Sequence, residues 1–223
     1  MSRQFAVIGL GRLGTAMVET LTSLGHDVLG IDRDGDLVQD RAGDYPQAHF
    51  VAADATDASV LHELDLAHFD GAAVVIGENI EASILATANL KEIGVPFVVA
   101  RAVTGLHARV LEKIGADRVV EPEKEMGAQV ARTMASPAVL DYVDLGEDEA
   151  LVEAEVPGEW AGRSLAELQL SRKSGLTVLA VKPKGGAGRI PRGDTVLRAS
   201  DVIVVGGTKE ALDRSKLITP GKR

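Results

Sequence analysis

A glycine motif near the start of the sequence constrains the fold more than any other feature. Residues 9–14 read Gly-Leu-Gly-Arg-Leu-Gly, which is the pattern G-x-G-x-x-G. The apolar run 5–8 precedes the motif, and a segment with helical spacing of its apolar residues follows it as far as Leu24. A strand, a glycine turn and a helix in this order are typical of the first unit of a dinucleotide-binding domain.

An acidic residue stands where such a domain requires one. Asp32 ends the second apolar run and lies 18 residues after Gly14, near the usual spacing of about 20. A carboxylate at this position accepts hydrogen bonds from ribose hydroxyls and repels a 2′-phosphate, so NADP is disfavoured. Gly9 permits the tight turn, Gly11 lets the backbone approach a pyrophosphate, and Gly14 lets the helix pack closely on the strand.

Strand and helix patterns continue to alternate over the first part of the chain. The further short apolar runs are residues 28–31, 50–53, 72–76, 97–100 and 118–120. They are apolar throughout, as expected for strands that are buried on both faces of a parallel sheet. We therefore predict a Rossmann-like α/β domain with a doubly wound parallel sheet over residues 1–138.

The pattern changes after a predicted helix over residues 123–135, which Pro137 ends. The following part is rich in strand patterns and glycine, and we predict a small α+β domain over residues 139–219, followed by a frayed tail at 220–223. Ser164 and Glu167 have the spacing of a helix capping box, and another helix is predicted to begin near Thr208. The predicted strands cover residues 150–156, 176–181 and 202–205, and the Gly-rich segment 184–188 is predicted to be a loop.

Composition excludes several classes of function. The chain has 24 Lys and Arg against 33 Asp and Glu, a net charge of −9, and only 3% aromatic residues. Acidic chains repel phosphate backbones, and few aromatics leave little surface for base stacking, so a nucleic-acid polymer is not an expected partner. The absence of cysteine excludes disulfides and thiolate metal sites.

Hydropathy predicts a soluble, intracellular protein. No stretch approaches the roughly 20 apolar residues that span a bilayer, and the N-terminal residues do not resemble a signal peptide. If the protein acts at a membrane, we expect it to do so through a partner.

Ligands of parallel α/β domains bind beyond the carboxyl ends of the strands. Residues 54–56 follow the third predicted strand, and residues 77–79 follow the fourth. The alternative interpretations are a helix cap at Thr56 or Asp57 and a plain turn at 77–79. The candidate nucleotide-binding residues are thus Gly9, Gly11, Arg12, Leu13, Gly14, Asp32, Arg33, Asp54, Ala55, Thr56, Gly77, Glu78 and Asn79.

Catalytic motifs do not accompany this nucleotide site. The Tyr-x-x-x-Lys pair of short-chain dehydrogenases does not occur, since Tyr45 is followed at that spacing by His49 and Tyr142 by Gly146. The sequence also contains no H-E-x-x-H, P-loop or G-x-S-x-G motif. A sensor of nucleotides is therefore the favoured interpretation, and an NAD(H)-dependent oxidoreductase or redox sensor is the alternative.

Several segments resemble one known family. They are residues 5–14, 77–83 (Gly-Glu-Asn-Ile-Glu-Ala-Ser), 110–118 (Val-Leu-Glu-Lys-Ile-Gly-Ala-Asp-Arg) and 121–127 (Glu-Pro-Glu-Lys-Glu-Met-Gly). Together they resemble the RCK (KTN) family, and within it the TrkA-like cytoplasmic Ktr subunits of bacterial potassium uptake systems. The resemblance covers essentially the whole chain, including a TrkA-C-like second domain.

The resemblance implies partners and ligands. Family members form homodimers that assemble into an octameric ring beneath a membrane potassium-translocating subunit of the KtrB or TrkH type. ATP or ADP binds in the Rossmann crevice, where ATP favours and ADP disfavours transport, and TrkA-like regulators bind NAD(H) instead. The second domain of the family can bind cyclic di-AMP. Here Arg172 and Pro191 lie in similar segments, although the loop at 183–189 departs from the family pattern.

The resemblance also implies roles for three charged residues. Arg12 approaches the γ-phosphate across the dimer interface, Arg101 matches a basic residue at the end of the fifth strand, and Glu123 matches a ligand of Mg²⁺ or Ca²⁺. Chemistry favours the role of Arg12, because a cation at a helix N-terminus is unfavourable unless an anion lies there. The alternatives are a solvated Arg12, and glutamates that complement the dipole of a helix beginning at Pro122.

Overall fold

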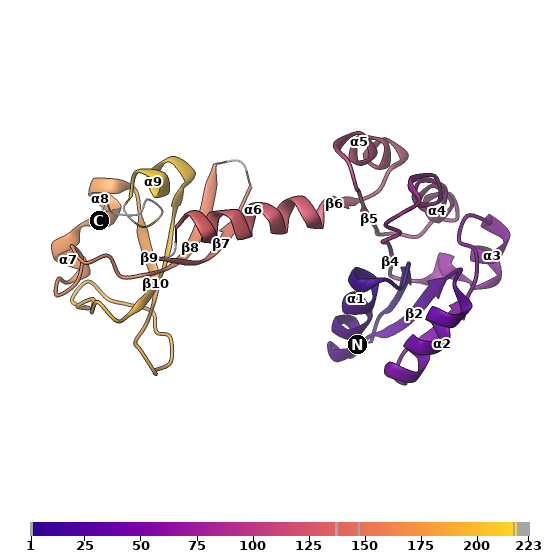
Figure 1. Cartoon of the computed structure of the whole chain (residues 1–223), viewed down its shortest axis with the longest axis horizontal. Coiled ribbons are helices and arrows are strands. Elements are labelled where there is room, and N and C mark those ends of the chain that lie inside the picture. Colours follow the sequence, from indigo (N-terminus) through magenta and orange to yellow (C-terminus); the bar gives the residue numbers. More distant parts are fainter. Residues whose placement is uncertain (1, 137, 147, 216, 218–223) are drawn as a thin grey trace. The chain divides into compact units, whose positions relative to one another are not determined.

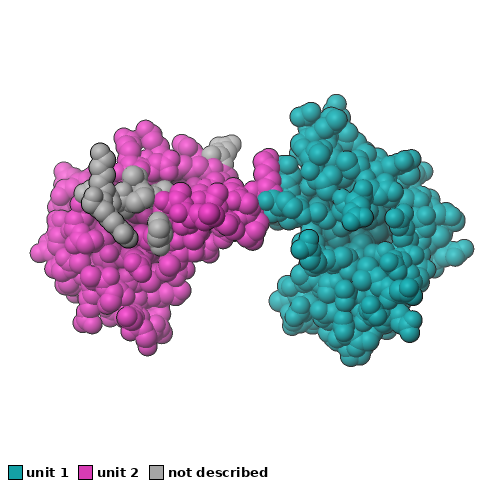
Figure 2. All heavy atoms as spheres, viewed as in Figure 1, with its two compact units in different colours: residues 1–123 teal, residues 124–223 magenta. Residues whose placement is uncertain are grey.

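The protein consists of two compact units. Its structure, a computed structural model, describes residues 2–136, 138–146, 148–215 and 217 of the 223-residue chain. The units comprise residues 1–123 and 124–223 (Figure 2). This division falls within the first turn of helix α6 (Pro122–Ala135), whereas the predicted domain boundary lies after that helix, at 138/139. Pro137 and the predicted tail at 220–223 lie outside the described residues.

A parallel sheet forms the centre of the first unit. Within its described residues, six strands are arranged in the order β3-β2-β1-β4-β5-β6, and every neighbouring pair is parallel (Figure 1). This is the doubly wound Rossmann-like arrangement that the sequence predicted. The strands are β1 (Gln4–Ile8), β2 (Asp27–Asp32), β3 (His49–Ala52), β4 (Gly71–Val74), β5 (Val98–Arg101) and β6 (Arg118–Val120).

Helices cover both faces of this sheet, which explains why its strands are apolar throughout. Val7 of β1 packs on one face with Val18 of α1, whereas its neighbour Ile8 packs on the other face with Leu90 of α4. Successive side chains of a strand point to opposite faces, so both faces require apolar residues. The helices are α1 (Arg12–Ser23), α2 (Gly35–Asp44), α3 (Ala58–Glu63), the short 3-10 helix η1 (Leu66–His68), α4 (Ile80–Glu92) and α5 (Gly105–Ile114).

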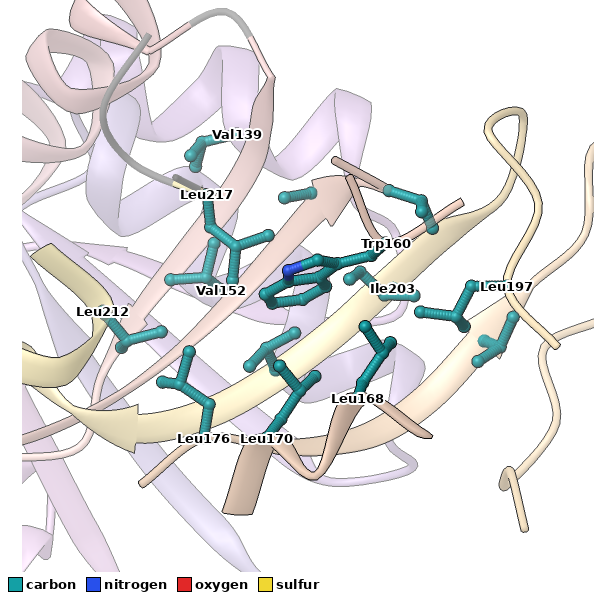
Figure 3. Packing of buried hydrophobic residues seen from close by; sticks show 14 of the residues in the cluster. Val139, Val152, Trp160, Leu168, Leu170, Leu176, Leu197, Ile203, Leu212 and Leu217 are labelled. Carbon is teal, nitrogen blue, oxygen red and sulfur yellow. The ribbon is translucent and has the colours of Figure 1, made fainter. Parts of the chain in front are cut away.

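The second unit is a small antiparallel α+β domain, as predicted. Its described residues form a sheet in the order β7-β8-β10-β9. Ala150, Val152 and Ala154 of β8 are buried in alternation, and Trp160 lies in the same core (Figure 3). The elements are β7 (Val139–Asp144), β8 (Glu149–Glu155), α7 (Leu165–Leu168), α8 (Leu170–Ser174), β9 (Thr177–Lys182), β10 (Val202–Thr208) and α9 (Lys209–Arg214).

Local sequence signals of the second unit are confirmed. Ser164 and Glu167 form both hydrogen bonds of a capping box at the start of α7. The Thr208 hydroxyl accepts the backbone N–H of Ala211 and caps α9. The Gly-rich segment 184–188 lies in the connection between β9 and β10. None of the described helices is long and apolar enough to cross a lipid bilayer.

One histidine is part of the core of the first unit. His107 on α5 is 2% exposed, and its Nδ1 accepts a hydrogen bond from the backbone N–H of Val103 at 3.3 Å. Within the described residues its Nε2 has no hydrogen-bond partner. Burial lowers the pKa of His107, because the protonated ring would lose its hydration.

Acidification should therefore destabilise the protein. The unfolded chain takes up a proton at His107 near the ordinary pKa of about 6.5, whereas the folded chain resists protonation, so stability falls as the pH falls below this value. His107→Gln should flatten the pH dependence of the free energy of unfolding in urea, compared between about pH 5.5 and 7.5. His62→Gln, at an exposed position, is the matched control. An unchanged slope in the His107 variant would contradict this assignment.

Candidate functional site

The sheet topology gathers the predicted site residues at one edge. All six strands described in the first unit are parallel, so the residues that follow their carboxyl ends lie along the same edge of the sheet. The strand order reverses between β1 and β4, and the glycine motif follows β1 at that point. Crevices at such switch points are where open α/β sheets bind ligands.

The glycine motif forms a tight turn from β1 into α1. Gly9 has a φ of +100°, and a Cβ there would lie 3.1 Å from backbone atoms of Val75 and Ile76. A Cβ on Gly14 would lie 1.8 Å from the carbonyl oxygen of Gly9. These two positions exclude any side chain, as the sequence predicted.

Gly11 has a different environment and begins the helix. It is the N-cap of α1 with ordinary extended angles, and a Cβ there would meet no atom within 4 Å. The first turn of α1, which the structure describes in full, contains no acidic residue. A helix N-terminus with room beside its N-cap and no acidic side chain in its first turn is the usual arrangement for binding a phosphate.

Asp32 connects the end of β2 to the glycine turn. Its Oδ2 accepts the backbone N–H of Leu10 at 2.7 Å, and its Oδ1 accepts the N–H of Asp34 at 3.1 Å. Each carboxylate oxygen can accept a second hydrogen bond, so both remain able to bind ribose hydroxyls. The sequence predicted the ribose contact but missed the role of Asp32 in holding the turn.

The segment after β3 is fixed by its own hydrogen bonds. Asp54 Oδ1 accepts both the N–H and the hydroxyl of Thr56, at 2.9 and 2.7 Å, and these bonds lower the pKa of the Asp54 carboxyl. Asn89 of α4 donates to the carbonyl of Thr56 at 2.9 Å, a contact that the sequence did not predict. The helix cap lies at Asp57, whose side chain accepts the N–H of Ser59. Ala55 is buried, and Arg33 is exposed near Asp54.

The segment after β4 combines a helix cap with space for an arginine. Asn79 caps α4 by accepting the N–H of Ala82 at 3.0 Å, and Glu78 is exposed. A Cβ on Gly77 would lie 2.5 Å from Nη1 of Arg101, the last residue of β5. Gly77 thus leaves the space that the Arg101 guanidinium occupies.

Arg101 and Arg12 provide positive charge around Glu123. The Arg101 guanidinium forms an ion pair with the Glu123 carboxylate, and the Arg101 side chain is only 19% exposed. The backbone N–H of Glu123 and then the charges of Arg101 and Arg12 lower the pKa of Glu123. Arg12 itself is exposed and Leu13 is half-buried. Arg101 and Glu123 thus lie together on the β5–β6 side of the edge, and the charge of Arg12 also acts on Glu123.

Glu123 does not form a complete cation site within one chain. Among the described residues, no group of three or more His, Asp or Glu side chains could hold a metal ion. Mg²⁺ and Ca²⁺ require about six oxygen ligands, and the two arginines near Glu123 oppose a further positive charge. The donor set of a single chain therefore does not fit a resident divalent cation. Helix α6 begins at Pro122, as the alternative interpretation of the glutamates assumed.

The second unit has a hollow of its own. A cavity of about 340 Å³ is lined by residues 165–166, 169–172 and 176–178, among them Arg172. Its lining is mostly apolar, with Arg172 providing a positive charge. Pro191, the other residue of the predicted cyclic di-AMP segments, does not line it.

Comparisons with known proteins agree with this architecture. Residues 5–122 match the TrkA-N domain, and residues 151–217 match the TrkA-C domain. The fold and the site thus define a Rossmann-type domain with a phosphate-binding glycine turn, followed by a small antiparallel domain. The chain belongs to the RCK (KTN) family of proteins that combine TrkA-N and TrkA-C domains, which confirms the resemblance noted from the sequence.

Individual relatives are similar over almost their whole length. The chain is 39% identical over 214 residues to the Ktr system potassium uptake protein C of Bacillus subtilis (strain 168), with 96% of each chain covered. It is also 39% identical over 210 residues to the Ktr system potassium uptake protein A of Vibrio alginolyticus, with 94% of each chain covered.

Solved structures share the fold. The GsuK channel bound to NAD superimposes with a TM-score of 0.72 at 18% identity, covering 100% of this chain and 40% of that chain. The crystal structure of the GsuK RCK domain gives a TM-score of 0.71 at 19% identity, covering 100% of this chain and 49% of that chain. The chain therefore spans half or less of the GsuK chains that it matches.

Two alanine substitutions separate packing from binding in the glycine turn. Gly14→Ala should lower the free energy of unfolding by about 3 kcal/mol or more, because the new methyl group would overlap the carbonyl oxygen of Gly9. Gly11→Ala should change stability by less than about 1 kcal/mol yet weaken nucleotide binding, since its methyl group would occupy the open space before α1. Urea unfolding and nucleotide-induced thermal shifts measure the two effects. Equal losses of stability in both variants would refute this division.

Proposed function

We propose that the chain is a nucleotide-sensing regulatory subunit of a membrane potassium transporter. Its Ktr relatives, 37–39% identical over nearly their full length, are named potassium uptake proteins. The protein would act by binding a nucleotide at the carboxyl edge of the first unit. We propose sensing rather than catalysis, because the residues at this edge are suited to binding phosphate and ribose, and the sequence contains no Tyr-x-x-x-Lys, H-E-x-x-H, P-loop or G-x-S-x-G motif.

The arrangement of charge along the edge is the observation that carries this proposal. Asp32 and Asp54 follow β2 and β3, where they can accept hydrogen bonds from an adenosine. The N-terminus of α1 and Arg12 follow β1, the next strand along the sheet, and Arg101 ends β5, and these groups can bind phosphates. An adenosine with a chain of phosphates, ATP or ADP, matches this order better than NAD(H), whose second nucleoside would lie beside two guanidiniums.

NAD(H) is the second candidate ligand, because the glycine turn and Asp32 suit any adenine dinucleotide. GsuK, which shares the fold, has been solved both bound to NAD and bound to ADP. Comparing the thermal shifts that ATP, ADP, NAD and NADH each produce separates the candidates. A ligand at about 100 times its dissociation constant stabilises by about 2.7 kcal/mol, which raises the melting temperature of a domain of this size by roughly 5–10 °C.

We further propose that the chain acts as a homodimer, from which a ring of eight is built. Helix α6 contains no buried residue, and Met126, Val130 and Met134 are 57%, 50% and 79% exposed. At a spacing of four residues these side chains lie on one face of the helix. An exposed apolar stripe of this kind is suited to pairing with the same helix of a second copy.

A divalent cation at Glu123 would require further ligands from a bound nucleotide or from a second copy of the chain. Phosphate oxygens could complete a Mg²⁺ or Ca²⁺ site at Glu123 by supplying ligands and balancing the two arginines.

Cyclic di-AMP would use the hollow of the second unit, where Arg172 could bind a phosphate. The membrane partner would be a potassium-translocating subunit of the KtrB or TrkH type, and co-purification from membranes tests this pairing.

Arg12→Ala tests the nucleotide switch directly. If Arg12 binds the terminal phosphate of ATP, its loss should weaken ATP binding about 10- to 100-fold, as expected for a charge-assisted hydrogen bond, and change ADP binding only a few-fold. Isothermal titration calorimetry measures both affinities. Arg3→Ala removes the same charge from an exposed residue at the amino end of β1, the opposite end of that strand, and serves as the control.

Two outcomes would refute parts of this proposal. If the difference between ATP and ADP survives in the Arg12 variant, another group reads the terminal phosphate. If NADH binds far more tightly than ATP, the protein is a redox sensor, and the roles of Arg12 and Glu123 must be withdrawn.

A further inference from the structure

Positive charge is concentrated in one segment of this acidic chain. Residues 163–198 contain eight Lys and Arg residues and two Asp and Glu residues. The rest of the chain contains sixteen Lys and Arg residues and thirty-one Asp and Glu residues. The segment has a net charge of +6 within a chain of −9. Such segregation creates a local positive potential that attracts anionic surfaces.

Much of this charge lies in the connection between β9 and β10, residues 183–201, which we call the β9–β10 loop. Figure 1 shows that it projects beyond the ends of the strands of the second unit. Its basic side chains are exposed, and within the described part of the chain they have no carboxylate partner. Asp201 is buried and accepts the backbone N–H of Arg198, so Asp194 is the loop's one exposed carboxylate. The basic residues of the loop are Lys184, Arg189, Arg192 and Arg198.

An isoleucine is exposed among these cations. Ile190 is 87% exposed, although burying an isoleucine is strongly favourable. The backbone on both sides of it is held in place. Arg189 exchanges two backbone hydrogen bonds with Val181, at 2.9 and 3.0 Å, and the N–H of Arg192 donates to the Thr195 hydroxyl at 2.9 Å. The loop therefore presents Ile190 outward from a fixed backbone.

A loop that exposes an apolar side chain and four basic ones is suited to the surface of an anionic bilayer. Basic residues attract lipid phosphates, and an apolar residue enters the boundary between headgroups and acyl chains. The loop contains no aromatic residue to stack on bases, which disfavours nucleic acid. We propose that the β9–β10 loop docks the second unit directly onto anionic lipid, independently of the nucleotide site.

Co-sedimentation of the purified full-length protein with vesicles tests this proposal. The protein should bind vesicles of phosphatidylglycerol and phosphatidylcholine, but not vesicles of phosphatidylcholine alone, and about 0.5 M salt should release it. Arg189→Gln with Arg192→Gln should weaken binding about 10- to 30-fold, since each basic residue near an anionic surface contributes about fivefold. Ile190→Ser should weaken binding at least about tenfold.

Matched variants keep the test specific. Arg3→Gln with Arg109→Gln removes the same charge from exposed positions of the first unit and should bind vesicles as the unaltered protein does. Trp160 fluorescence reports whether the loop variants retain the core of the second unit. Arg12→Ala should also bind vesicles normally, so a failure of the nucleotide proposal leaves this one intact.

Several results would overturn the proposal. They are no binding to anionic vesicles, equal binding to neutral vesicles, and unchanged binding by the loop variants. Release by about 10 mM inorganic phosphate at constant ionic strength would show a site for small anions instead of lipid. If the loop variants bind vesicles normally but no longer co-purify with a membrane protein in detergent, the loop docks on protein.

Discussion

The close packing of α1 on the end of β1 is the constraint on which the binding edge depends. A Cβ on Gly14 would lie 1.8 Å from the Gly9 carbonyl oxygen, so only glycine lets the helix approach this near. The approach fixes the axis of α1 and hence the direction of its first N–H groups. Asp32 holds the same turn from β2 through the N–H of Leu10. The N-terminal end of the helix is thus positioned by packing and one charge-assisted hydrogen bond.

Charged groups of both signs follow the strands along the edge. Asp32 and Asp54 follow β2 and β3, with Arg33 near Asp54, whereas Arg12 follows β1 and Arg101 ends β5. Glu123 already balances part of this positive charge through its ion pair with Arg101. An incoming phosphate would bring a further negative charge to the same two guanidiniums and would compete with Glu123 for them. Because Glu123 lies in the first turn of α6, this competition acts at the start of the helix that leads into the second unit.

Local patterns were sufficient to predict most of the fold. The apolar strands, the glycine turn and the capping box at Ser164 depend on neighbours in the sequence, and each is found where it was predicted. Contacts between distant segments were not predictable in this way. The space that Gly77 leaves for Arg101, and the bond from Asn89 to Thr56, join residues that only the folded sheet brings together. A polar residue that follows a strand in the sequence was therefore correctly placed at the carboxyl edge of the sheet. The residue that it contacts there could not be predicted.

The start of α6 brings an apolar stripe and two charged groups together. Met126, Val130 and Met134 are exposed along the helix, Glu123 belongs to no group of three or more metal-ligating side chains among the described residues, and Arg12 is exposed. Each exposed apolar side chain forgoes the favourable free energy that its burial would contribute. A second copy would cover the stripe on α6, which begins at Pro122 beside Glu123. Pairing of chains and binding of nucleotide would then affect the same few residues, so each can influence the other through a shared free energy.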